Sequence, residues 1–182
     1  MSDAHNNINE FLLNFYTYSL YNKISLLKIC PCGRMPEHIL SGIKAIVAMK
    51  LRRKGLLQKE IAEIIKSDRS IVSHYLSGRY PKEKILKVAE IFEELPPKYG
   101  AKLIHSLTDD KELAKNLIEE LYNIKFLWDE KSCIACGSCL GCVALTLDNF
   151  TVNIDYDACF LCASCIFRCP TNSLNFVREN YD

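Results

Sequence analysis

Before residue 131, hydrophobic residues recur at helical spacing along most of the chain. Apolar positions three and four residues apart indicate amphipathic helices, and proline and glycine interrupt the pattern where helices should begin or end. Asp109, followed three residues later by Glu112, has the form of a capping box. The pattern predicts helices over residues 8–27, 37–54, 58–65, 69–76, 81–95 and 109–124, with one or two further turns over 98–106.

The pattern changes in the last part of the chain. Two runs rich in strand-forming residues, 143–147 and 150–154, flank Asp148 and Asn149 and predict a short β-hairpin. We therefore expect an all-α N-terminal part followed by a small α+β C-terminal part. The expected divisions are an N-terminal helix over 1–36, a helical domain over 37–95, a helical connector over 96–130 and a C-terminal domain over 131–182.

Formal charge is distributed unevenly. The whole chain has 23 basic and 22 acidic residues, so its net charge of +1 indicates no particular partner. Residues 44–87, however, hold twelve basic and four acidic residues, a net charge of +8, whereas residues 131–182 have a net charge of −2. A basic segment of this kind is typical of proteins that bind nucleic acids.

The N-terminus bears on the cellular compartment. Residues 1–10 are polar and lack the basic segment and small-residue cleavage site of a secretory signal. Polar side chains interrupt residues 11–29, so no apolar run approaches the roughly 18 residues of a membrane span. We therefore expect a cytoplasmic protein without a membrane partner, in which clustered cysteines are more often metal ligands than disulfides.

The string QKEIAEIIKSDRSIVSHYLSG, residues 58–78, resembles the helix-turn-helix of the lambda-repressor and Cro class. In this class two short helices cross closely, which requires a small side chain at the crossing. Lys66 stands where the class usually has glycine, so the turn must tolerate an uncommon backbone angle. The features that carry the resemblance are Gln58 at the start, Ala62 at the crossing, Val72 in the second helix, and the exit Leu76, Ser77 and Gly78.

The resemblance implies that the second helix reads double-stranded DNA in the major groove. Symmetric half-sites normally accompany this motif, so it also implies a homodimer, which the N-terminal helix and the helices after Leu95 would pair. The implied contacts to bases and phosphates are Gln58, Arg69, Ser70, Ser73, His74, Arg79 and Lys82. The alternative is that these side chains form only a solvated face.

The chain contains ten cysteines, and eight of them form two runs. The runs are Cys133-x2-Cys136-x2-Cys139-x2-Cys142 and Cys159-x2-Cys162-x2-Cys165-x3-Cys169-Pro170, and they repeat with an offset of 26 residues. The second run is the bacterial ferredoxin signature, so this part resembles two-cluster 4Fe–4S ferredoxins. The remaining pair, Cys30 and Cys32, has no assigned role.

In that family the fourth cysteine of each run crosses to the other cluster. The resemblance implies one 4Fe–4S cluster on Cys133, Cys136, Cys139 and Cys169, and a second on Cys159, Cys162, Cys165 and Cys142. The first run has only two residues before its last cysteine, and Val143 replaces the usual proline. If this shifts the Cys142 sulfur, the second cluster becomes labile or takes a 3Fe–4S form. Zinc bound by paired Cys-x2-Cys knuckles remains an alternative.

Two functions fit these features. The first is a DNA-binding transcriptional regulator whose clusters sense redox state, oxygen or iron, similar to helix-turn-helix and ferredoxin fusion proteins of anaerobic archaea such as methanogens. The alternative is a ferredoxin-type electron-transfer protein or oxidoreductase subunit that works with a redox partner, in which the helical part is a docking module. The sequence has no phosphate-binding glycine loop and no nucleophile with an evident base, so we expect no enzymatic activity.

Overall fold

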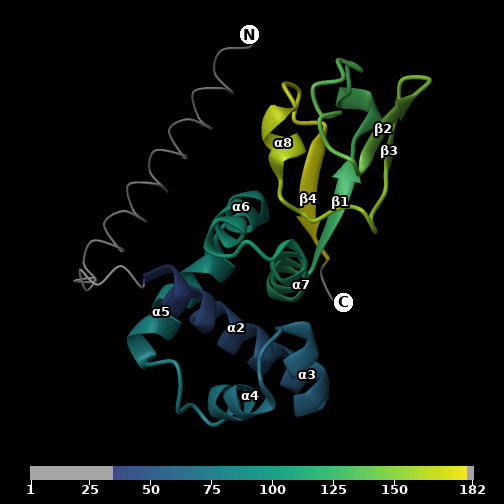
Figure 1. Cartoon of the computed structure of the whole chain (residues 1–182). Coiled ribbons are helices and arrows are strands. Elements are labelled where there is room, and N and C mark those ends of the chain that lie inside the picture. The colour runs from purple at the N-terminus through teal and green to yellow at the C-terminus, as the bar shows by residue number, and fades with distance from the viewer. Residues whose placement is uncertain (1–34, 180–182) are drawn as a thin grey trace. The chain divides into compact units, whose positions relative to one another are not determined.

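The computed structural model describes residues 35–179 (Figure 1). The predicted N-terminal helix, its expected dimerisation role, and Cys30 and Cys32 lie outside this range. The described helices are α2 (Met35–Arg53), α3 (Gln58–Ile64), α4 (Arg69–Leu76), α5 (Glu83–Glu94), α6 (Pro97–Leu107), α7 (Lys111–Tyr122), the single 3-10 turn η1 (Glu130–Ser132) and α8 (Ser164–Arg168). The strands are β1 (Ile124–Trp128), β2 (Leu145–Asp148), β3 (Thr151–Ile154) and β4 (Leu174–Arg178).

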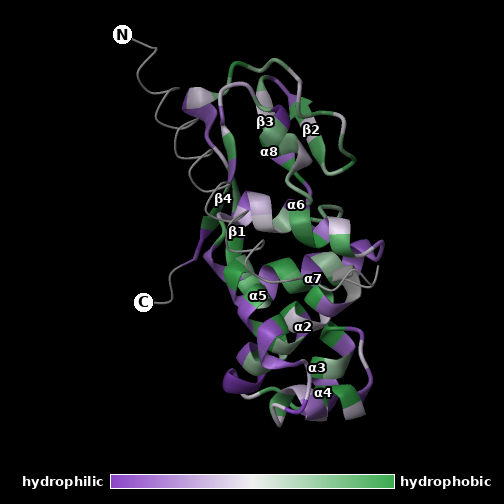
Figure 2. Cartoon of the chain, turned by 90° about the vertical axis from the view of Figure 1, so that its left-hand side faces the viewer, coloured by the Kyte–Doolittle hydropathy of each residue, from purple (hydrophilic) through white to green (hydrophobic). Residues whose placement is uncertain are grey.

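Helices α2 to α7 share a hydrophobic core. On α7 the predicted apolar stripe is buried, including Leu113, Leu117 and Leu121, and the helices carry hydrophobic and hydrophilic residues side by side (Figure 2). Lys50 of α2 donates a hydrogen bond to the carbonyl oxygen of Leu121 at 2.7 Å. The side chain of Asn116 donates to the carbonyl oxygen of Ile64 at 3.0 Å. These bonds tie α7 to α2 and α3.

The predicted pair of short helices is present as α3 and α4, which pack against each other. Lys66, in the turn between them, has φ 45°, so the expected uncommon backbone angle is confirmed. The Lys66 amine pairs with Asp110 at 2.9 Å and with Glu112 at 2.7 Å. The turn residue therefore links the helix pair to the start of α7.

The C-terminal part contains two small antiparallel sheets. The predicted hairpin is present as β2 and β3, although β2 begins at Leu145 and not at residue 143. The sequence pattern missed the pairing of β1 with β4, which places Phe126 opposite Phe176 with their ring centroids 5.4 Å apart. At this level the expected fold class is confirmed: a helix-rich part precedes a small α+β part. In residues 35–179 no helix has the length and hydropathy to cross a membrane.

The start of α7 differs from the prediction by one residue. Its N-cap is Asp110 and not Asp109, because the Asp110 carboxylate accepts a hydrogen bond from the backbone N–H of Leu113 at 3.0 Å. That hydrogen bond and the nearby Lys66 amine lower the pKa of Asp110 below its ordinary value. The ionised carboxylate is therefore the form that stabilises the fold.

We expect Asp110→Ala to lower the free energy of unfolding by about 1 kcal/mol at neutral pH, because the cap is lost. A carboxylate whose pKa is depressed in the folded state stabilises the protein above its unfolded pKa, and this contribution disappears as pH falls through the folded pKa. The difference between wild type and variant should therefore shrink in acid. Denaturant unfolding at several pH values measures it, with Asp109→Ala as the control that should change little.

Candidate metal centre

The two cysteine loops, residues 133–139 and 159–165, have matching backbones. In the first loop Ala135 and Gly137 have φ of 51° and 70°, and in the second Leu161 and Ala163 have φ of 55° and 60°. These positions correspond under the offset of 26 residues. Residues in this left-handed region turn successive backbone N–H groups toward a common concavity, which is the arrangement of anion-binding nests and many iron–sulfur sites.

The first loop encloses a cavity together with a cysteine of the second run. Cys133, Cys136, Cys139 and Cys169 all line it, and Leu147 and Val152 of the β2–β3 hairpin form an apolar wall. Cys139 interacts electrostatically with the other three thiols. The fold therefore places Cys169, which belongs to the second run, beside the first loop.

The second loop shows the reciprocal arrangement. Burial raises the pKa of Cys165 to about 12, and Cys159, Cys162 and Cys142 add to the shift through electrostatic repulsion. Burial also raises the pKa of Cys159, and Cys142 again contributes. Cys142 of the first run therefore lies within electrostatic range of the second loop.

Hydroxyl groups accompany the cysteines. Burial by itself would raise the pKa of Cys169, but hydrogen bonds with Ser173 at 3.1 Å and Thr171 at 3.6 Å outweigh it and lower the pKa to about 7. Cys136 lies 3.4 Å from the hydroxyl of Ser138, and Cys162 lies 3.5 Å from that of Ser164. The hydroxyl contacts lower the pKa of Cys136 and Cys169 and so favour their thiolates, the form that binds metal.

Sequence reasoning missed these serines, although the repeat marks them. Ser138 and Ser164 stand at equivalent positions of the two runs, one residue before the third cysteine. Nothing comparable marks Ser173, which is buried and reaches Cys169 only because β4 follows directly. Gly141, just before Cys142, leaves room for the Arg168 guanidinium, with which a Cβ at this position would overlap.

Zinc and an iron–sulfur cluster place different demands on the thiols. A tetrahedral zinc site requires four ligands that converge on one ion. In residues 35–179 no three histidine, cysteine, aspartate or glutamate side chains are arranged to hold a single metal ion. In a 4Fe–4S cluster each thiolate binds a different iron, so the sulfurs need not converge on one point.

The side chains predicted to contact DNA lie mostly in solvent. Arg69, Ser70, Ser73 and His74 are exposed on one side of α4, Gln58 is half-buried at the start of α3, and Arg79 and Lys82 are exposed between α4 and α5. Four other lysines of the basic segment are neutralised within the fold. The pairs are Lys50–Glu93, Lys54–Glu120, Lys66–Asp110 with Glu112, and Lys87–Glu83.

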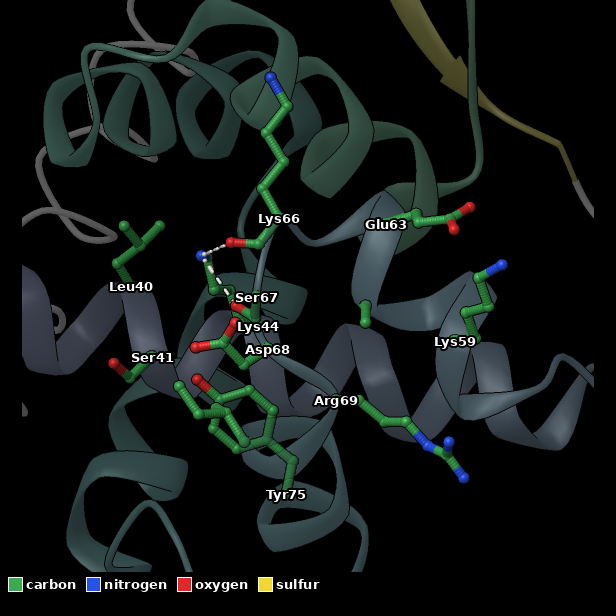
Figure 3. Close-up of a pocket in the computed structure, with 12 residues that line it drawn as sticks. Leu40, Ser41, Lys44, Lys59, Glu63, Lys66, Ser67, Asp68, Arg69 and Tyr75 are labelled. Atoms are coloured by element: carbon green, nitrogen blue, oxygen red, sulfur yellow. Dashed lines mark hydrogen bonds between the residues drawn. The ribbon is translucent and has the colours of Figure 1, made fainter.

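A cavity of about 700 Å³ lies beside the helix pair, lined by residues of α2, α3 and α4 (Figure 3). Figure 3 shows the Lys44 amine directed at the turn, where it donates to the carbonyl oxygen of Lys66 at 3.2 Å and to the hydroxyl of Ser67 at 3.1 Å. Burial lowers the pKa of Lys44. The most buried cation of this cavity is therefore used to hold the turn.

The paired cysteine loops and the small antiparallel sheets define a ferredoxin-type iron–sulfur protein. No family model matches the sequence, and no solved structure matches it. A curated protein of Methanocaldococcus jannaschii, the ferredoxin-type protein FwdE, is 86% identical over 145 residues, which cover 80% of this chain and 99% of that protein. The chain belongs to the family of this ferredoxin-type protein.

This relationship corrects the predicted function. The prediction of a DNA-binding, redox-sensing transcriptional regulator is wrong, because the relative is named as a ferredoxin-type protein. The expected DNA partner, and the homodimer inferred from DNA half-sites, are corrected with it. The helix pair exists, but neither the structure nor the comparisons show membership of the lambda-repressor and Cro class. The net charge of +8 over residues 44–87 was a misleading indication of DNA binding, because ion pairs neutralise part of this segment.

Proposed function

We propose that this protein is an electron carrier with two 4Fe–4S clusters. Each cluster is held by three cysteines of one loop and one cysteine from the other run. The ligands of the first cluster are Cys133, Cys136, Cys139 and Cys169, and those of the second are Cys159, Cys162, Cys165 and Cys142.

The observation that carries the proposal is the exchange of the fourth cysteine. Cys169 lines the cavity of the first loop, and Cys142 interacts with Cys159 and Cys165 of the second loop. Two separate sites of paired cysteine knuckles would not need this exchange. A pair of ferredoxin clusters does, because three thiolates of a tight loop leave one iron without a ligand.

A bound cluster supplies one-electron chemistry at low potential. The chain's own residues place the thiolates, and the left-handed loop positions direct backbone N–H groups toward them. The N–H of Leu161 already donates to the Cys159 sulfur at 3.4 Å. Ser173 and Thr171 stabilise the Cys169 thiolate, which readies this residue for iron. Leu147 and Val152 keep water from one side of the first loop.

We assign the helical part a docking role and place catalysis in the partner. Helices α2 to α5 contribute no side chain to the cavity of the first loop. The surface that we assign to contact with an oxidoreductase is the exposed side of α4, with Arg69, Ser70, Ser73 and His74. In this proposal the protein relays electrons and transforms no substrate itself.

We expect protein purified without oxygen to contain about eight irons and about eight acid-labile sulfides per chain. Reduction with dithionite should produce electron paramagnetic resonance signals of 4Fe–4S clusters. About seven irons would mean that the second site holds a 3Fe–4S cluster, as the short spacing from Cys139 to Cys142 suggests. Stoichiometric zinc without sulfide would overturn the proposal.

A further inference from the structure

Four lysines of α6 and α7 contact one short stretch of the C-terminal part, residues 156–167, which contains Cys159, Cys162 and Cys165. Lys98 and Lys102 lie 6.0 Å and 5.0 Å from the ring centroid of Phe167. Lys111 lies 5.7 Å from that of Phe160. The fourth, Lys115, donates a hydrogen bond to the carbonyl oxygen of Tyr156 at 2.8 Å.

These lysines differ from those of the basic segment in their partners. None of the four forms a salt bridge with another residue of the described range, whereas Lys50, Lys54, Lys66 and Lys87 all do. The nearby acidic residues of the described range have other contacts. Asp155 accepts backbone N–H bonds from Asp157 and Ala158, and Glu119 interacts electrostatically with Lys115 without a salt bridge between them.

Helix α6 also holds the loop itself. His105 Nε2 lies 2.8 Å from the carbonyl oxygen of Phe160, the residue directly after Cys159. Lys115 reaches the same stretch through the carbonyl oxygen of Tyr156, three residues before Cys159.

No residue of α6 or α7 lines the cavity of the first loop. The residues that line it all lie between Cys133 and Leu174. Cys136 of this loop is exposed, whereas Cys159 and Cys165 of the second loop are buried. Burial makes additional negative charge costly. The second site therefore needs compensating positive charge more than the first does.

We propose that the lysine face of α6 and α7, formed by Lys98, Lys102, Lys111 and Lys115, stabilises the reduced form of the second cluster. This inference rests on the proposed function. One electron from an external low-potential donor adds one negative charge to the cluster, and the ammonium groups of these lysines lower the free energy of that state. The four lysines are positioning residues for this charge and bind no iron.

The test is a redox titration of the anaerobic protein followed by electron paramagnetic resonance, comparing wild type with Lys111→Gln/Lys115→Gln. At a fixed potential we expect the reduced-to-oxidised ratio of the second cluster to fall about tenfold. For a one-electron couple this is about 59 mV. The ratio of the first cluster should stay unchanged. Cys136→Ser and Cys162→Ser, at matched positions of the two loops, assign the signals.

Two further variants separate charge from structure. Lys115→Arg keeps the charge and should retain the wild-type potential. Lys84→Gln, on α5, removes one positive charge away from the loops and should shift neither cluster. Unchanged potentials in a double variant with about eight irons would overturn the inference while leaving the proposed function intact. Protein without iron and sulfide would overturn both.

Discussion

Cys169→Ser is expected to remove the first iron–sulfur cluster and leave the second in place, although Cys169 belongs to the second cysteine run. Cys169 lines the same cavity as Cys133, Cys136 and Cys139. Iron should fall from about eight to about four per chain, because a cube that lacks one thiolate is readily lost. Iron and sulfide analysis of the anaerobically purified variant measures this change.

Cys142→Ser is the matched control, because it exchanges the roles. Cys142 interacts with Cys159 and Cys165, so this variant should lose the second cluster and keep the first. The electron paramagnetic resonance spectra of the two reduced variants should therefore differ, and their sum should reproduce the wild-type spectrum. If Cys169→Ser instead lost the cluster of its own run, the ligand exchange that carries the proposed function would be refuted.

Gly100→Ala is expected to destabilise the protein by about 3 kcal/mol, the largest effect of any single methyl group that we predict. Gly100 of α6 is buried, and a Cβ there would overlap the hydroxyl and ring of Tyr122 on α7. The ring is fixed, because the Tyr122 hydroxyl donates a hydrogen bond to the carbonyl oxygen of Phe92. Denaturant unfolding of the cluster-loaded protein measures the loss.

Two variants show whether steric overlap is the cause. Gly78→Ala introduces a side chain at φ 68° but meets no atom within 4 Å, so it should cost only about 1 kcal/mol of backbone strain. In a Tyr122→Leu background the overlap is relieved, and Gly100→Ala should then cost about 1 kcal/mol or less. Equal costs for Gly100→Ala and Gly78→Ala would contradict the close packing of α6 and α7.

The packing of α6 and α7 matters because these helices join the two parts of the protein. Helix α7 is bonded to α2 through Lys50 and reaches the second cysteine loop through Lys115. Arg178 of β4 donates to the carbonyl oxygens of Glu93 and Leu95 at the end of α5. Stability of the helical part and retention of the second cluster should therefore be linked.

The sequence pattern predicted helices well where the buried stripe is local. The apolar positions of α7 repeat every three and four residues, so a short window contains all the information. It failed for β1 and β4, because the strands pair across about fifty residues and each is too short to show alternation by itself. The predicted N-cap of α7 is one residue before the observed N-cap, because both Asp109 and Asp110 have side chains that can cap a helix.

The functional prediction failed for a reason of the same kind. Formal charge was summed over residues 44–87, but the carboxylates of Glu93, Asp110 and Glu120 lie outside that window and neutralise lysines within it. A helix pair with a small residue at the crossing satisfies a packing demand that any small helical protein shares. The resemblance to a DNA-binding motif therefore carried less information than it suggested.

By itself, the sequence determined the spacing of the eight cysteines, their repeat and the helical periodicity, because covalent separation and side-chain period are properties of the chain alone. Only the tertiary structure decided which thiols meet, since Cys169 reaches the first loop through the fold. It also decided the left-handed turns at Ala135, Leu161 and Ala163, which these residue types do not favour. The net charge of a surface likewise depends on ion pairs between elements that are far apart in the sequence, and a short stretch of sequence does not show these pairs.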